Sequence, residues 1–227
     1  MGDISISNYI GSLMYSQHGS TYHLCGASLL SRTKALTAAH CLKRPVTYYL
    51  TMGVTDLENF NSPALQTSQV SRIDIHPGYI DGDVRDDIAV LTLKTPMNLT
   101  PNVNVIKLSR PYDHYLGRGC QVNGWGATEW GTTRVLQNAR FSVSPLWSCR
   151  IFWFSLTGRR DLVNYRDICA RSWSKAVCFG DSGGPLTCNK RLSGVLSWGA
   201  TDCNTGYPGV FTRVRSYKDW IYEIMGN

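Results

Sequence analysis

Eight cysteines constrain this chain of 227 residues more than any other feature, because their number is even and no Cys-x-x-Cys pair occurs among them. Such pairs are typical of zinc ribbons and redox motifs, and we therefore expect neither a metal nor a cofactor. An even set of cysteines in a chain of this size indicates disulfides, which persist in secreted proteins and are rare in the cytosol. We accordingly expect a protein that is secreted or held in a secretory granule.

The composition is that of a folded globular protein. Hydrophobic residues make up 43% of the chain and charged residues 17%, with a formal net charge of +7. These values exclude intrinsic disorder and collagen-like structure. No stretch approaches the roughly 18 consecutive apolar residues that a membrane-spanning helix needs. The length fits either two modest domains or one large all-β unit.

Short runs of β-forming residues, separated by turn residues, recur along the chain and predict an all-β fold. A polar segment at 109–114 contains a proline near the midpoint of the chain, and it predicts a domain boundary near residue 110. The predicted strands cover residues 48–52, 70–75, 88–93, 103–108, 192–198 and 209–214.

One convincing helix is predicted, over residues 216–226 at the C-terminal end. Trp220, Ile221 and Ile224 recur at the three-to-four spacing of an amphipathic helix, and Ser216 can cap its first turn. We expect this apolar stripe to pack against the β-structure.

The sharpest local motif is Gly-Asp-Ser-Gly-Gly-Pro around Ser182, where glycines permit a tight backbone. A serine hydroxyl becomes a nucleophile when a base removes its proton and a carboxylate orients that base. Of the five histidines, only His40 lies in an apolar frame of small residues, Leu-Thr-Ala-Ala-His-Cys. Asp87 leads into the apolar run Ile-Ala-Val-Leu, and a buried acid needs partners. Taken one at a time, Ser182 fits a serine in a turn, His40 a histidine in the core and Asp87 a cap at the start of a strand.

In this order, the Thr-Ala-Ala-His-Cys, Asp-Ile-Ala-Val-Leu and Gly-Asp-Ser-Gly-Gly-Pro segments resemble the chymotrypsin-type serine proteases. The resemblance extends from about Tyr9 to the terminal helix. It implies two six-stranded antiparallel Greek-key β-barrels with a C-terminal α-helix. Residues 1–110 would form the barrel that carries the histidine and the aspartate, and residues 111–227 the barrel that carries the serine and the specificity pocket.

The resemblance also implies roles for individual residues. Ser182 would be the nucleophile, His40 the general base and then acid, and Asp87 the group that fixes the imidazole tautomer. The backbone N–H groups of Gly180 and Ser182 would form the oxyanion hole. Sequence alone leaves 105 ways to pair eight cysteines. The family pairing implied is Cys25–Cys41, Cys120–Cys188, Cys149–Cys169 and Cys178–Cys203.

Substrate binding is implied for a set of residues around the serine. Ala176 stands at the pocket floor, where trypsin-like members carry Asp, so cleavage after Lys or Arg is not expected. Glycines at 199 and 209 leave the walls open, and we predict Phe, Tyr, Leu or Met before the cut. Val177 narrows the base and favours Leu and Met over Tyr. The full set is Ala176, Val177, Phe179, Ser197, Trp198, Gly199 and Gly209.

The N-terminal segment departs from the family pattern. Active members begin with an Ile-Val-Gly-Gly-type terminus whose ammonium pairs with the acid before the serine, here Asp181. Residues 1–5 show neither that start nor the regions of a signal peptide. Three explanations stay open: an incomplete chain, a form without its activation peptide, or a homologue that never matures.

A second departure is the long segment 150–168 between two cysteines, which mixes aromatic residues with arginines. It is explained either by Phe152 and Trp153 packing on the second barrel or by an exosite. The positive charge favours anionic partners such as polysaccharides, and no motif indicates nucleic-acid binding. A sequon predicts glycosylation at Asn98.

The sequence as a whole predicts a monomeric secreted serine endopeptidase that acts on protein or peptide substrates and is open to protein protease inhibitors. The alternative is a zymogen-like or catalytically silent homologue that binds partners through segment 150–168. An intact set of catalytic residues argues against this alternative, and the N-terminal departure argues for it.

Overall fold

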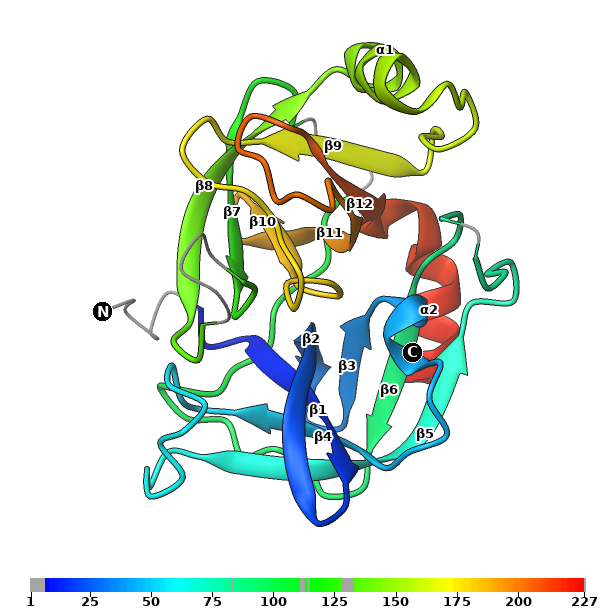
Figure 1. Cartoon of the computed structure of the whole chain (residues 1–227). Coiled ribbons are helices and arrows are strands. Elements are labelled where there is room, and N and C mark those ends of the chain that lie inside the picture. Colours follow the sequence, from blue (N-terminus) through cyan, green and yellow to red (C-terminus); the bar gives the residue numbers. More distant parts are fainter. Residues whose placement is uncertain (1–6, 83, 111–112, 114, 128–132, 227) are drawn as a thin grey trace.

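The computed structural model describes residues 7–82, 84–110, 113, 115–127 and 133–226. Its strands form two closed antiparallel barrels of six strands each, ordered β1-β2-β3-β6-β5-β4 and β10-β11-β12-β9-β8-β7, which confirms the predicted fold class. Figure 1 shows the barrels one above the other. The first comprises β1 (Ile10–Gln17), β2 (Ser20–Ser31), β3 (Lys34–Thr37), β4 (Tyr48–Met52), β5 (Gln66–Ile75) and β6 (Ala89–Leu93). The second comprises β7 (Gly119–Gly124), β8 (Gln137–Ser144), β9 (Asp167–Arg171), β10 (Pro185–Cys188), β11 (Arg191–Trp198) and β12 (Gly209–Arg213).

The predicted strand 103–108 is wrong, because this segment forms no strand. Its apolar residues Val103, Ile106 and Leu108 are buried, but they are spaced at three and two residues rather than in strict alternation. The backbone instead bonds to several separate segments, for example from Ile106 N to Leu29 O. The segment is therefore an irregular connector that is anchored by buried side chains.

The C-terminal helix begins later than predicted. A 3-10 turn, η3 (Val214–Tyr217), precedes α2 (Lys218–Met225). Ser216 lies inside η3 and is exposed, and no side chain caps α2, so the predicted cap is wrong. The apolar stripe is nevertheless used, because Ile221 is fully buried. It packs with the core of the first barrel, and Figure 1 shows α2 running down beside that barrel.

A second helix, α1 (Leu146–Thr157), was not predicted. Its sequence is rich in aromatic residues and has no polar N-cap, since Pro145 precedes it. Tertiary contacts hold it instead: Cys149 is disulfide-bonded to Cys169, and Trp153 is buried. No helix in the described parts of the chain is both long and apolar enough to cross a membrane.

We propose that the domain boundary lies near residue 110, between the last strand of the first barrel at Leu93 and the first strand of the second at Gly119. Residues 111, 112 and 114 of the predicted linker lie outside the described residues. The C-terminal helix belongs in sequence to the second unit, but its buried face belongs to the first barrel. The helix therefore links the second barrel to the core of the first.

Candidate active site

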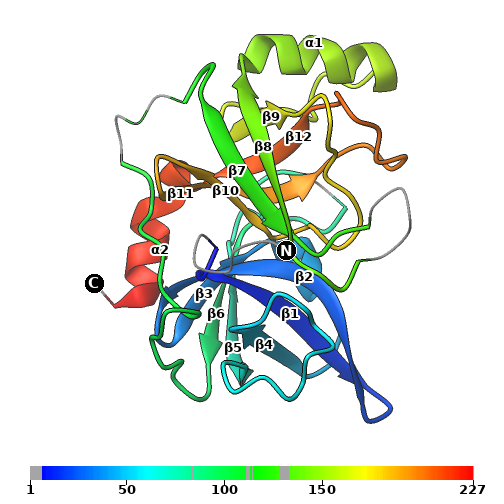
Figure 2. The same ribbon diagram turned by 90° about the vertical axis from the view of Figure 1, so that its left-hand side faces the viewer.

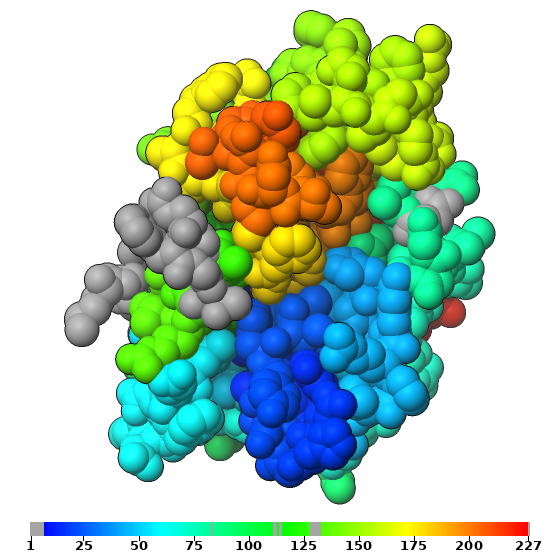
Figure 3. Space-filling view, in the orientation of Figure 1, coloured from blue at the N-terminus to red at the C-terminus, as the bar shows by residue number. Residues whose placement is uncertain are grey.

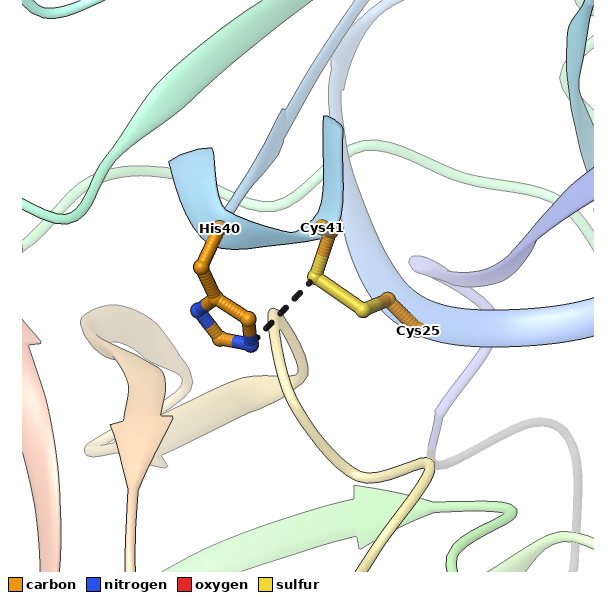
Figure 4. A group of neighbouring side chains, drawn as sticks. All are labelled: Cys25, His40 and Cys41. Carbon is orange, nitrogen blue, oxygen red and sulfur yellow. Dashed lines mark hydrogen bonds between the residues drawn. A yellow bond between two sulfur atoms is a disulfide. The ribbon is translucent and has the colours of Figure 1, made fainter. Parts of the chain in front are cut away.

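His40 lies on η2 (Ala39–Leu42), a short 3-10 turn between two strands of the first barrel. The next residue, Cys41, is disulfide-bonded to Cys25 on β2, which ties this turn to the barrel wall. Figure 4 shows the imidazole beside this disulfide, with His40 Nε2 at 3.9 Å from Cys41 Sγ. The side chain of His40 is 29% exposed, so one ring edge remains open to an incoming group.

These three residues form the one cluster of metal-ligating types among the described residues. Both sulfurs are bonded to each other and are not thiolates, the form of cysteine that binds metals. Figure 4 therefore shows a histidine braced by a disulfide rather than a metal centre. The acids of the loop after Gly53, Asp56 and Glu58, both form ion pairs with Arg134.

Asp87 is buried and holds His40 by two bonds. Its Oδ2 lies 2.7 Å from His40 Nδ1, and its Oδ1 accepts the backbone N–H of His40 at 2.9 Å. The second barrel contributes a third bond, because Ser197 Oγ donates to the same Oδ2 at 2.6 Å. Thr212 Oγ1 donates to the carbonyl oxygen of Asp87 at 2.9 Å. This arrangement fixes the ring so that Nε2 faces away from the carboxylate.

Ser182 belongs to the turn that precedes β10. Figure 3 shows the yellow segment before this strand at the centre of one face, between the orange and blue surfaces of the two barrels. Gly26 N, on β2, donates to Ser182 O at 2.7 Å. A Cβ on Gly183 would come within 2.3 Å of Thr37 Oγ1, so only glycine permits this close approach. The serine turn is thus docked beside the segment that leads into η2.

Within the described residues, Ser182 Oγ makes no hydrogen bond, to His40 Nε2 or to any other group. Loose hydrogen bonds between catalytic groups are frequent in ligand-free enzymes and tighten when substrate binds.

Gly180 adopts φ +94°, a conformation that favours glycine. Its carbonyl oxygen lies 2.9 Å from His23 Nε2, and His23 Nδ1 lies 2.7 Å from Ser12 Oγ. This chain fixes the orientation of the Gly180 backbone. In the described part of the chain the N–H groups of Gly180 and Ser182 donate to no partner. Two unpaired donors therefore lie on either side of Asp181.

The carboxylate of Asp181 points away from His40 into the second barrel. It accepts the N–H groups of Gly126 at 2.8 Å and Cys178 at 3.0 Å. Burial raises its pKa to about 6, and these two bonds only partly oppose that effect. The same residues line a cavity of about 600 Å³. No described residue supplies a cation to this carboxylate.

The predicted substrate-binding residues do not all come together. The sequence predicts walls left open by Gly199 and Gly209 and a base narrowed by Val177, and in the structure Val177 lies against both glycines. Cγ2 of Val177 lies 2.8 Å from an ideal Cβ position on Gly199 and 3.0 Å from one on Gly209. The physical reason is that Val177 is buried with the core of the second barrel.

The other predicted pocket residues lie around this core. Ala176 lines the cavity of Asp181. Phe179 is 67% exposed, whereas Ser197 is buried against Asp87. Trp198 is half-buried, with its ring centroid 4.7 Å from that of Trp153 on α1.

Segment 150–168 is therefore partly helical and touches the site. Phe152 and Trp153 pack on the second barrel, where both rings also meet Tyr207. This is the packing explanation given above for these two aromatic residues. Asn98 is exposed, so glycosylation at this position stays a prediction.

The eight cysteines form four disulfides with no free thiol. The pairs are Cys25–Cys41, Cys120–Cys188, Cys149–Cys169 and Cys178–Cys203, the same pairs that the resemblance implies.

Sequence reasoning missed the second-barrel partners of Asp87 and the chain through His23. Ser197 was predicted only as a substrate-binding residue, yet its hydroxyl bonds to the buried carboxylate of Asp87. No spacing rule connects residues 110 positions apart, so only the docking of the barrels reveals this bond. The apolar frame that singled out His40 gave no signal for His23.

Comparisons with known proteins agree with this geometry. The family model described as Trypsin matches residues 4–221. A chymotrypsin-like serine proteinase from Haliotis rufescens is 34% identical, over 93% of this chain and 84% of that protein. Fibrinolytic enzyme isozyme C from Lumbricus rubellus is 33% identical, over 90% of each chain. Trypsin from Squalus acanthias is 32% identical, over 91% of this chain and 87% of that protein.

Proposed function

This chain belongs to the trypsin family and is a serine endopeptidase, and from that premise we propose that His40, Asp87 and Ser182 are its catalytic residues. The observation that carries the proposal is the pair of bonds from Asp87 to His40, made beside the turn that holds Ser182. The named proteinases among its relatives do not favour a silent binding protein.

In the proposed reaction, Ser182 Oγ attacks the carbonyl carbon of the scissile peptide while His40 Nε2 accepts its proton. His40 then gives this proton to the leaving amine, which leaves an acyl ester on Ser182. A water molecule then attacks the ester carbon while His40 Nε2 accepts a proton from it. His40 returns this proton to Ser182 Oγ as the new carboxylate is released. Asp87 keeps His40 Nδ1 protonated, so that Nε2 is the free base.

The oxyanion that forms at the carbonyl oxygen needs preorganised donors. We propose the unpaired N–H groups of Gly180 and Ser182 for this role. Losing one such donor typically costs about 2.7–4 kcal/mol of transition-state stabilisation. The bond from His23 to Gly180 O supports this role, because it fixes the adjoining backbone.

We propose cleavage after apolar or aromatic residues (Phe, Tyr, Leu or Met), with Leu and Met preferred over Tyr. Neither Ala176 nor Val177 offers a charge to a Lys or Arg side chain, and Val177 occupies the space between the two wall glycines. Replacing Val177 by Gly should move the preference toward Phe and Tyr, because the cavity it opens fits a flat ring. Profiling both forms with peptides that differ only at the residue before the cut measures this shift. An unchanged profile in V177G would contradict the assignment.

Asp181 is the proposed acceptor for an N-terminal ammonium group. A cation beside this buried carboxylate would stabilise its charged form and oppose the effect of burial. N-terminal sequencing of the mature natural protein, followed by acetylation of that terminus, tests the pair. Acetylation should abolish activity if the ammonium group is required.

Titration with a fluorophosphonate tests the catalytic assignment directly. The mature protein should bind one probe per chain, and S182A should bind none. H40A should react far more slowly than a control with Ser193, a buried serine on the same strand as Ser197, replaced by Ala. Labelling of S182A at the wild-type rate would overturn the assignment.

We further propose that the protein is secreted, acts as a monomer and is inhibited by protein protease inhibitors that bind at the catalytic residues. The four disulfides support secretion, since such bonds persist outside the cytosol.

A further inference from the structure

We propose that the outer face of the second barrel binds a sulfated polysaccharide through Arg140 and Arg171, at a site separate from the catalytic residues. A hollow of about 450 Å³ opens on this face. Its lining combines two arginines, four serines and one tryptophan with two apolar residues. The lining residues are Arg140, Ser142, Val143, Ser144, Pro145, Arg171, Ser172, Trp173 and Ser174.

Strand register brings the two arginines together. Ser142 on β8 pairs with Arg171 on β9, and Arg140 lies two residues before Ser142 on the same strand. Arg140 and Arg171 are therefore diagonal neighbours, a relation that places Cα atoms about 7–8 Å apart and Cβ atoms somewhat closer. Figure 2 shows β8 facing the viewer with α1 above it. Both side chains line the same hollow, so an anion bound there is attracted by two positive charges.

Neither guanidinium has an acidic partner among the described residues. Other arginines do have an acidic partner. Arg72, Arg134 and Arg159 all form ion pairs. Arg140 makes no ion pair or hydrogen bond within the described part of the chain, and Arg171 makes only a contact with an aromatic ring.

That ring belongs to Trp173, which is 75% exposed. The Arg171 guanidinium lies over it at 4.4 Å from the ring centroid. A cation–π contact of this kind holds the guanidinium in place while its N–H groups stay free to bind. A preorganised guanidinium loses less conformational entropy when it binds an oxyanion bidentately.

The basic surface continues beyond this hollow. Arg140 also lines a second hollow of about 810 Å³, whose lining contains Lys107 and Lys190, both exposed. No Asp or Glu is found among the described residues that line either hollow. The two hollows, which share Arg140, together contain four basic side chains. This arrangement suits a chain of repeated anions better than one small ion.

Several observations favour a sulfated polysaccharide over other polyanions. The site is concave, which suits a protruding chain better than a flat membrane surface. Serine hydroxyls beside the arginines can exchange hydrogen bonds with sugar hydroxyls as well as with sulfate oxygens. The four disulfides indicate an oxidising compartment, where extracellular polysaccharides occur and intracellular nucleic acids do not.

Heparin, as a sulfated probe, tests the site in the full-length protein. Wild type should be retained on immobilised heparin above physiological salt of about 0.15 M. R140A/R171A should bind a heparin dodecasaccharide at least about tenfold more weakly in calorimetry, since each lost charged hydrogen bond is worth roughly that factor. W173A should weaken binding and W173F should restore it, because the ring holds Arg171.

The matched control is K94A/R110A, which removes two positive charges from exposed positions that line neither hollow. It should keep most of the affinity, and all variants should keep their melting temperature and peptidase activity. Equal losses in both double variants would overturn the proposal, because binding would then follow net charge alone. Equal affinity for desulfated heparin would overturn it as well. So would single-stranded DNA or phosphatidylserine vesicles that bind more tightly than heparin with the same dependence on Arg140 and Arg171.

Discussion

At the scale of single residues, the carboxylate of Asp87 accepts a hydrogen bond from a hydroxyl of the other barrel. Ser197 Oγ donates to the oxygen that also holds His40 Nδ1, in a buried setting. Replacing Ser197 by Ala leaves this carboxylate short of one charge-assisted bond, which is worth about 1.5–3 kcal/mol. We expect kcat to fall roughly tenfold to a hundredfold with little change in KM, because the backbone of Ser197 is unaltered.

Steady-state kinetics of S197A on a short chromogenic peptide measures this effect. The control is S193A on the same strand, where the lost bond is to the neutral carbonyl of Arg191. S193A should keep wild-type kcat, and a matching fall in both variants would show a general loss of packing instead.

A second residue-scale effect concerns the pH dependence of stability. Burial raises the pKa of Asp167 from 3.8 to about 7, and the bond from Asn164 N only partly opposes this. The folded state therefore binds a proton more tightly than the unfolded state. The stabilisation from this proton is present below pH 3.8 and is lost as the pH rises toward about 7, at up to about 1.4 kcal/mol per pKa unit.

Asp167→Asn keeps an oxygen for the Asn164 N–H group but removes the titration. The unfolding free energy of D167N relative to wild type should therefore increase from pH 4 to pH 7. Urea melts at a series of pH values measure this difference, with the exposed Asp219→Asn as control. Parallel curves for wild type and D167N would refute the expected titration.

At the scale of elements, α1 is held by what its buried side packs against. Trp153 meets Trp198 at 4.7 Å between ring centroids, and its indole N–H is buried with no hydrogen-bond partner among the described residues. W153A should lower the unfolding free energy by about 3–5 kcal/mol, because it leaves a large cavity. W153F should cost much less, since it keeps a ring and removes an unpaired polar group.

Denaturant unfolding of both variants tests this contrast. A W153F protein as unstable as W153A would mean that the indole nitrogen has a partner in solution. Because Trp198 is one of the predicted substrate-binding residues, W153A should also raise KM for peptide substrates.

The elements show where sequence patterns succeed and fail. Residues 48–52 were predicted as a strand and form β4 with the same bounds, because a short run of β-forming residues favours a strand locally. The helix α1 was missed, since its formation depends on the Cys149–Cys169 bridge and on aromatic partners distant in sequence. The strand prediction for segment 103–108 was wrong for another reason. Its apolar residues are buried, but its backbone bonds to separate segments rather than to one neighbouring strand.

At the scale of the whole molecule, the motifs around His40, Asp87 and Ser182 could be found in the sequence because each is local. The close contact of Val177 with Gly199 and Gly209 could not, because it depends on how three segments of the second barrel meet. The bond between Ser197 and Asp87 joins the two barrels and escaped prediction for the same reason. Local motifs thus predict the type of reaction, whereas the geometry of the site depends on how the two barrels dock.

That docking has a polar centre that can be tested. Tyr9, just before β1, places its buried hydroxyl 2.9 Å from Thr187 Oγ1 and 3.2 Å from Asn123 Nδ2, both in the second barrel. Tyr9→Phe leaves these two groups without this hydrogen-bond partner, which should lower the free energy of unfolding by about 1–3 kcal/mol. Tyr22→Phe is the control, because that ring is 49% exposed.

We expect Y9F to unfold in one transition with an unchanged denaturant slope. The first-barrel core includes Leu192 and Val195 of β11 and extends to Ile221 of α2, so the barrels cannot separate without exposing shared apolar surface. Urea unfolding followed by fluorescence and by circular dichroism checks this in one experiment. Two transitions, or probes that disagree, would show that the barrels unfold independently and that the Tyr9 contacts alone had coupled them.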